Sequence, residues 1–99
     1  MDFVFKKKKI ELLYTTEKDA HKYPNVIDDF FEVMAMITAA ETIQDLYANK
    51  GLHFEKLKGK RGKQGQYSLR LNKQWRLIVI IEQDPQGKYL LIIDIEDYH

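Results

Sequence analysis

The sequence predicts an α+β fold in which an N-terminal strand and two to three helices pack on an antiparallel β-meander. Apolar residues recur at helical spacing between residues 24 and 41, whereas from residue 67 onward they alternate with polar residues, as in strands. Turn sequences at 72–74 and 84–87 divide this second half into three strands. Helices followed by hairpin-connected strands indicate helices packed on one face of a sheet.

Length and composition indicate a single globular domain spanning residues 1–99. Hydrophobic residues make up 44% of the chain and aromatic residues 12%, well outside the disordered class. A chain of 99 residues can bury one modest core and has no room for a second. The absence of cysteine excludes disulfides and thiolate metal sites.

The N-terminal half predicts a strand at residues 2–5 and a helix at 6–22, with helical apolar spacing from Ile10. The run Lys6–Lys9 would begin this helix, where positive charge opposes the helix dipole. We therefore expect acidic side chains or an anionic ligand near these lysines.

A second helix should follow Pro24, because proline suits the first helical turn. Thr38–Glu41 fits a capping box for a further helical turn, and Gly51 fits its stop. The apolar face of the second helix, which we expect in the core, consists of Ile27, Phe30, Phe31, Met34 and Ile37.

Residues 58–65 (KGKRGKQG) predict a flexible basic loop, because their glycines match no phosphate-binding spacing. The hairpin that follows joins residues 67–71 to 75–81 through a tight turn. The last strand starts at Lys88 and is apolar as far as Ile95.

The hairpin brings two arginines together on the face away from the core. Apolar residues of the two strands face each other when the numbers of directly paired residues sum to an even value. A sum of 146 sets Arg70 opposite Arg76, whereas a sum of 148 sets Arg76 opposite Asn72. Opposed like charges are destabilising unless an anion or carboxylates lie between them, and the guanidinium fork suits phosphate. The alternative is ion pairing within the protein, to Asp94, Glu96 or Asp97.

The positive charge is concentrated in one segment. Between Lys50 and Arg76, nine basic residues accompany the single acid Glu55, a net charge of +8, so the remainder carries −7 in a chain of net charge +1. A basic strip attracts polyanions, and phosphate contacts dominate nucleic-acid affinity. A solvated lysine-rich loop is the alternative interpretation.

The last residues, Asp97, Tyr98 and His99, offer a carboxylate, a phenol and an imidazole for proton transfer or stacking. A frayed chain end is the alternative. The histidines lack the spacing of metal ligands, so no metal site is predicted.

Four segments in order, Leu57–Arg61, Gly65–Asn72, Gln74–Arg76 and Asp97–His99, resemble motifs of the HigB-type toxins in the RelE/ParE superfamily. The resemblance implies a RelE-like, microbial-ribonuclease-like fold. It also implies an endoribonuclease that cleaves mRNA in the ribosomal A site without a cofactor, and a helix-turn-helix antitoxin as partner.

The resemblance also assigns residues. It places in the active site Lys58, Arg70, Arg76, Asp97, Tyr98 and His99. Glu55 stands where some relatives have histidine, which leaves the general base open. The residues expected to contact mRNA or ribosomal RNA are Lys56, Lys60, Arg61, Lys63, Asn72 and Lys73.

We expect a cytoplasmic protein, since the N-terminal segment lacks a signal-peptide pattern and no apolar run approaches the roughly 20 residues that span a bilayer. Two other functions stay open: a ParE-like inhibitor of gyrase, and an RNA-binding module without catalysis.

Overall fold

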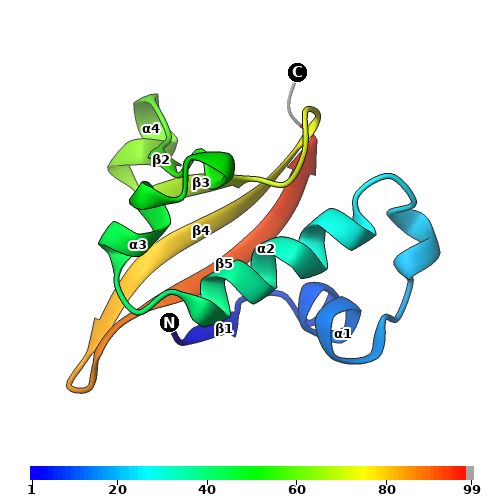
Figure 1. The fold of residues 1–99 in the computed structure, drawn as a ribbon, viewed down its shortest axis with the longest axis horizontal. Coiled ribbons are helices and arrows are strands. Elements are labelled where there is room, and N and C mark those ends of the chain that lie inside the picture. The colour runs from blue at the N-terminus through cyan, green and yellow to red at the C-terminus, as the bar shows by residue number, and fades with distance from the viewer. Residues whose placement is uncertain (98–99) are drawn as a thin grey trace.

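The computed structural model describes residues 1–97 and shows helices packed on a five-stranded mixed sheet (Figure 1). The strands are β1 (Phe3–Phe5), β2 (Glu55–Lys56), β3 (Gln66–Arg70), β4 (Trp75–Asp84) and β5 (Gly87–Asp97). The helices are α1 (Lys8–Thr16), α2 (Ile27–Ala39), α3 (Ile43–Ala48) and α4 (Gly59–Lys63), with short 3₁₀ turns η1 (Ala20–Lys22) and η2 (Lys50–Leu52).

The sheet confirms the predicted α+β class. It contains the predicted meander and N-terminal strand and one further strand, β2. Its strand order is β1-β5-β4-β3-β2, in which β3, β4 and β5 form the meander. The N-terminal strand β1 lies parallel to β5, and the two-residue β2 lies antiparallel to β3 at the other edge. Strand β2 was not predicted, because two residues cannot show the alternation that marks a strand.

The register of the β3–β4 hairpin is the one with paired residue numbers summing to 146. Arg70 pairs with Arg76 and Leu69 with Leu77, so the alternative register of 148 is wrong. The apolar residues favour this register, because a shifted register would lose the direct pairing of Leu69 with Leu77 in the buried layer.

The core lies between one face of the sheet and helices α1, α2 and α3; α2 crosses the sheet in Figure 1. Phe30 and Met34 of α2 are fully buried, as predicted, whereas Ile27 and Phe31 are only partly buried. The sheet contributes Leu69, Leu71, Leu77, Val79, Leu90, Ile92 and Ile95 to this core.

The first helix is shorter than predicted, because it ends at Thr16 instead of continuing to Lys22. Glu17 adopts a left-handed conformation (φ 57°), and its N–H donates to the carbonyl oxygen of Leu13, which closes the last turn. The lysines at its start do have acidic neighbours, as expected: Lys7 pairs with Asp94 at 2.5 Å.

The capping box lies four residues later than predicted. Thr38 belongs to α2 instead, where its hydroxyl donates to the carbonyl oxygen of Met34. The box is formed by Thr42 and Asp45 at the start of α3. Gly51 lies within the turn η2 and does not end α3, which stops at Ala48.

The predicted flexible loop contains a helix, α4. Gly62 is required there by close packing and not for flexibility, since a Cβ at this position would lie 2.0 Å from the carbonyl oxygen of Leu57. A glycine-rich sequence therefore forms a helix that packs tightly against the segment leading into it. Within residues 1–97, no helix is long and apolar enough to cross a membrane.

Candidate functional site

The candidate site lies on the face of the sheet opposite the core. Strand pairing aligns two rows of side chains on this face, because directly paired residues point to the same side. The first row consists of Glu55, Ser68, Ile78 and Asp94. The second row, two residues along each strand, consists of Arg70, Arg76 and Glu96.

A pocket of about 370 Å³ opens on these rows, between β2 and α4 on one side and β5 on the other. Ile78 and Ser68, exposed by only 2% and 3%, are the most buried residues that line it. The residues that line the pocket are Glu55, Lys56, Leu57, Lys58, Arg61, Ser68, Arg76, Ile78, Glu96 and Asp97.

The guanidinium group of Arg76 is held by the β3–β4 turn. Its Nη1 atom donates to the carbonyl oxygens of Asn72, at 2.8 Å, and of Trp75, at 3.1 Å. Because Arg76 is also partly buried, its side chain loses little further freedom when it binds an anion. The turn thus presents a fixed cation in the pocket.

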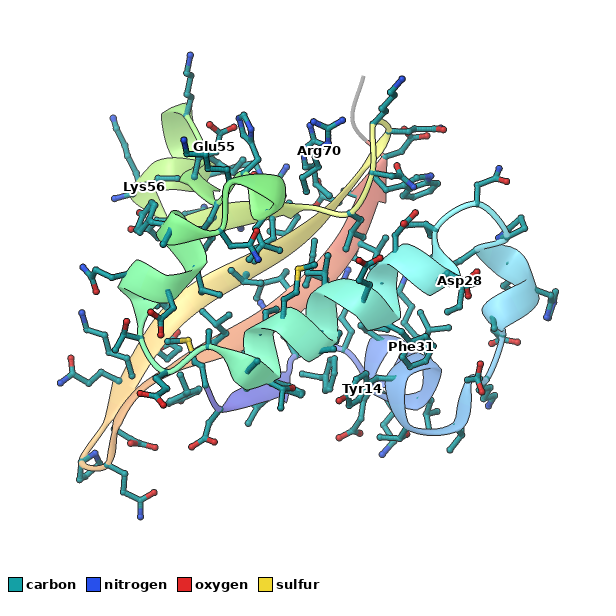
Figure 2. All side chains as sticks on the ribbon, viewed as in Figure 1. Tyr14, Asp28, Phe31, Glu55, Lys56 and Arg70 are labelled. Atoms are coloured by element: carbon teal, nitrogen blue, oxygen red, sulfur yellow. The ribbon has the colours of Figure 1, made fainter. Side chains whose placement is uncertain are left out.

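Arg70, predicted for the active site, lies directly opposite Arg76 but outside the residues that line the pocket. Figure 2 shows the side chains of Arg70 and Glu55 at the same end of the molecule, where α4 and β2 lie. Arg70 is therefore a neighbour of the pocket.

Lys58 and Asp97, also predicted, both line the pocket. Lys58 is exposed and directly precedes α4, and the carboxylate of Asp97 accepts a hydrogen bond from the Gln74 amide at 3.1 Å. Tyr98 and His99 lie outside the described residues.

The expected RNA-contact residues fall into two groups. Lys56, Lys60, Lys63 and Lys73 are exposed, as a docking surface requires. Asn72 instead bonds within the protein: its oxygen accepts from the N–H groups of Gln74 and Trp75, both at 2.9 Å, and its amide nitrogen donates to Asn25 and Asp29.

Arg61, the remaining residue of that set, forms a two-pronged ion pair with Glu96. Its Nη1 and Nη2 atoms donate to the two carboxylate oxygens of Glu96 at 2.8 and 2.7 Å, and its Nε donates to Gln66. The hydrogen bond with Glu96 raises the pKa of Arg61. The pair connects α4 to β5 along the pocket.

Three polar or charged residues that line the pocket were not predicted as site residues: Glu55, Ser68 and Glu96. The Oε2 atom of Glu55 lies 3.7 Å from the Nε2 atom of His53, a residue just outside the pocket lining. The register could have located Ser68 and Glu96, because Ser68 lies two residues before Arg70 and Glu96 pairs with Arg76.

The pocket thus combines the fixed guanidinium of Arg76 and the exposed Lys58 with carboxylates, above a floor formed by Ile78 and Ser68. Lys58 and Arg76 can neutralise the charge of a phosphate, and Glu55 and Asp97 offer oxygens that accept a proton. Such a combination suits proton transfer next to a phosphate group.

Comparison with known proteins supports a specific family. Residues 3–96 match the family of HigB-like toxins, described as the RelE-like toxin of the type II toxin–antitoxin system HigB. Among solved structures, the chain is similar to a YoeB/ParE toxin from Agrobacterium tumefaciens, with a TM-score of 0.56 and 14% sequence identity over 100% of both chains. That likeness concerns the fold alone, and no curated protein matches the chain in sequence. Because the family match covers nearly the whole length, this chain belongs to the HigB-like toxins, the RelE-like toxins of type II toxin–antitoxin systems.

Proposed function

We propose that this toxin is a ribosome-dependent endoribonuclease that cleaves mRNA in the A site and so inhibits translation in the cytoplasm. The observation that carries the proposal is the placement of Arg76, fixed by the turn, in one pocket with Lys58 and Asp97. Ribonuclease chemistry needs cations for the phosphate and groups that move protons, and the pocket holds both kinds.

In the proposed reaction, the 2′-oxygen of a ribose attacks the adjacent phosphorus and the 5′-oxygen of the next nucleotide leaves. Arg76 and Lys58 stabilise the additional negative charge of the phosphorane, and Arg70 anchors the neighbouring backbone. Asp97 or Lys58 takes the 2′ proton, with Glu55 as a further carboxylate at the pocket edge. His99 donates the proton to the leaving oxygen, and Tyr98 stacks on a base.

The proposed reaction needs neither a metal ion nor an oxidant or reductant. One phosphorus–oxygen bond forms and one breaks, so the products carry a 2′,3′-cyclic phosphate and a 5′-hydroxyl. The site is open and small, and the ribosome would supply the positioning of the substrate. The exposed residues Lys56, Lys60, Lys63 and Lys73 would contact ribosomal RNA.

Membership of a type II family implies an antitoxin partner. We propose that this partner carries a helix-turn-helix domain. The negative charge outside the basic strip offers it a surface distinct from the RNA-binding end.

The test is to map the 5′ ends of cellular mRNA after brief expression of the toxin. The wild-type chain should generate new ends within translated codons, and Arg76→Ala should not. Lys88→Ala, on the β4–β5 hairpin away from the pocket, is the matched control and should leave the ends unchanged.

Two results would favour the other functions. Growth arrest that survives Arg76→Ala together with accumulating DNA breaks would indicate a gyrase inhibitor. Salt-sensitive ribosome binding with intact mRNA would indicate an RNA-binding module.

A further inference from the structure

The Arg61–Glu96 pair has the geometry with which arginine holds a phosphate. Both terminal nitrogens of Arg61 donate to separate oxygens of one carboxylate, at 2.8 and 2.7 Å. The two free oxygens of a phosphodiester offer the same pair of acceptors to the same fork. The carboxylate of Glu96 therefore occupies a position that an RNA phosphate could take.

Other cations surround this position. On neighbouring strands, Glu96 of β5 lies directly opposite Arg76 of β4, and Arg76 lies directly opposite Arg70 of β3. Two like charges directly opposed on a sheet repel, and Glu96 adds the negative charge next to them. Arg61 thus reaches from α4 to the Glu96 carboxylate in a pocket that Arg76 also lines, with Arg70 one strand further along the same row.

The pair is accessible enough to exchange. The side chains of Arg61 and Glu96 are 44% and 36% exposed, so water screens their attraction and a competing anion can reach the guanidinium. A buried pair would resist such an exchange, because separating it would leave an uncompensated charge.

We propose that Arg61 forms, beside Arg76, a subsite for the phosphodiester of the RNA strand next to the scissile one, and that Glu96 is its internal anion, which the RNA phosphate displaces. The proposal rests on the proposed function for the class of ligand. Glu96 then lowers the affinity of the free toxin for RNA, and a strand that is held in place displaces it more readily.

The experiment measures binding of a fluorescein-labelled single-stranded RNA whose riboses all carry 2′-O-methyl groups, so that it cannot be cleaved by 2′-oxygen attack. Glu96→Gln should bind it about tenfold more tightly than wild type, as expected when one charge-assisted contact no longer has a competitor. Glu82→Gln is the matched control: it removes the same charge from β4, six residues from Arg76, and should change the Kd less than about twofold.

A double variant tests whether the tighter RNA binding of Glu96→Gln depends on Arg61. Adding Arg61→Gln to Glu96→Gln should abolish the tenfold gain. The proposal is overturned if Glu96→Gln binds no more tightly than Glu82→Gln, or if the gain persists in the double variant. A weaker-binding Glu96→Gln would also overturn it, by showing that the ion pair only holds α4 in place.

This result is independent of cleavage. If wild type cleaves mRNA on ribosomes but Glu96→Gln binds RNA no more tightly, only the subsite proposal fails. If Glu96→Gln binds more tightly but wild type cleaves no mRNA, the proposed nuclease function fails and the subsite stands.

Discussion

At the scale of single residues, the site depends on one arginine held by backbone atoms. The Nη1 atom of Arg76 is fixed by two carbonyl oxygens of its own turn, and a lysine, which has a single side-chain nitrogen, could not keep this anchor and engage a phosphate with a second nitrogen. Preorganised charge is the main means by which a small open site can stabilise a phosphorane.

Arg76→Lys should therefore lose activity although it keeps the charge. We expect single-turnover cleavage of mRNA on programmed ribosomes to fall about 10²-fold or more, as when one preorganised donor is removed from an enzyme site. Thermal unfolding should be nearly unchanged. A variant that cleaves at the wild-type rate would show that only the charge at this position matters.

Asn72 contributes to stability at the same turn. Asn72→Ala leaves the N–H groups of Gln74 and Trp75 without their acceptor and breaks the link to Asn25 and Asp29. We expect the free energy of unfolding in urea to fall by about 2 kcal/mol. Lys73→Ala, at an exposed neighbour, should have almost no effect; an equally small effect of Asn72→Ala would contradict this role.

At the scale of elements, the start of α3 contains a pH-dependent contact. The carboxylate of Asp45 accepts from the N–H groups of Glu41, at 2.8 Å, and Thr42, at 3.0 Å. These bonds, first that to Glu41 and then that to Thr42, lower the pKa of Asp45 below its usual 3.8. The stabilisation is therefore present above pH 3.8 and is lost as the pH falls through the lowered pKa.

Asp45→Asn should be less stable than wild type at neutral pH, and the difference should shrink once the pH falls below 3.8. Urea unfolding at several pH values measures it. Glu41→Gln removes a neighbouring charge and keeps the capping box, so it serves as control. A difference between Asp45→Asn and wild type that is constant with pH would disprove the assignment.

The helix α4 depends on the missing side chain of Gly62. Gly62→Ala would force its Cβ against the Leu57 carbonyl, so we expect a loss of about 1–3 kcal/mol in unfolding free energy and weaker RNA binding, because Lys58 and Arg61 shift. Gly51→Ala is the control, since its Cβ would meet the Asn49 side chain only at 3.4 Å. Equal stability of the two variants would contradict this packing.

The sequence best predicted the elements in which apolar residues recur at regular spacing over several residues. Pairing Leu69 with Leu77 predicted the β3–β4 register that sets Arg70 opposite Arg76, although the sequence left the register of 148 open. The helix α4 could not be predicted, because its two glycines and three charged residues give no period and its packing depends on the Leu57 carbonyl. The Arg61–Glu96 contact could not be predicted either, because it joins residues 35 positions apart through that unpredicted helix.

At the scale of the whole molecule, the sheet separates two surfaces. One face is covered by α1, α2 and α3, and the other carries the pocket, next to the basic segment that begins at Lys50. The division of charge seen along the chain thus has a counterpart in the fold, in which the basic segment folds as η2, β2, α4, β3 and the start of β4. A nearly neutral protein can in this way present one strongly basic end to a polyanion.

The proposed cleavage of mRNA in this pocket requires attack by a ribose 2′-oxygen. The most direct measurement is cleavage by the purified toxin on ribosomes programmed with two mRNAs, identical except that one carries 2′-deoxyribose on the 5′ side of the A-site cut. We predict that the ribose mRNA yields a 2′,3′-cyclic phosphate and a 5′-hydroxyl end and that the deoxy mRNA stays intact. Cleavage of both mRNAs, or products with 5′-phosphate ends, would contradict the account.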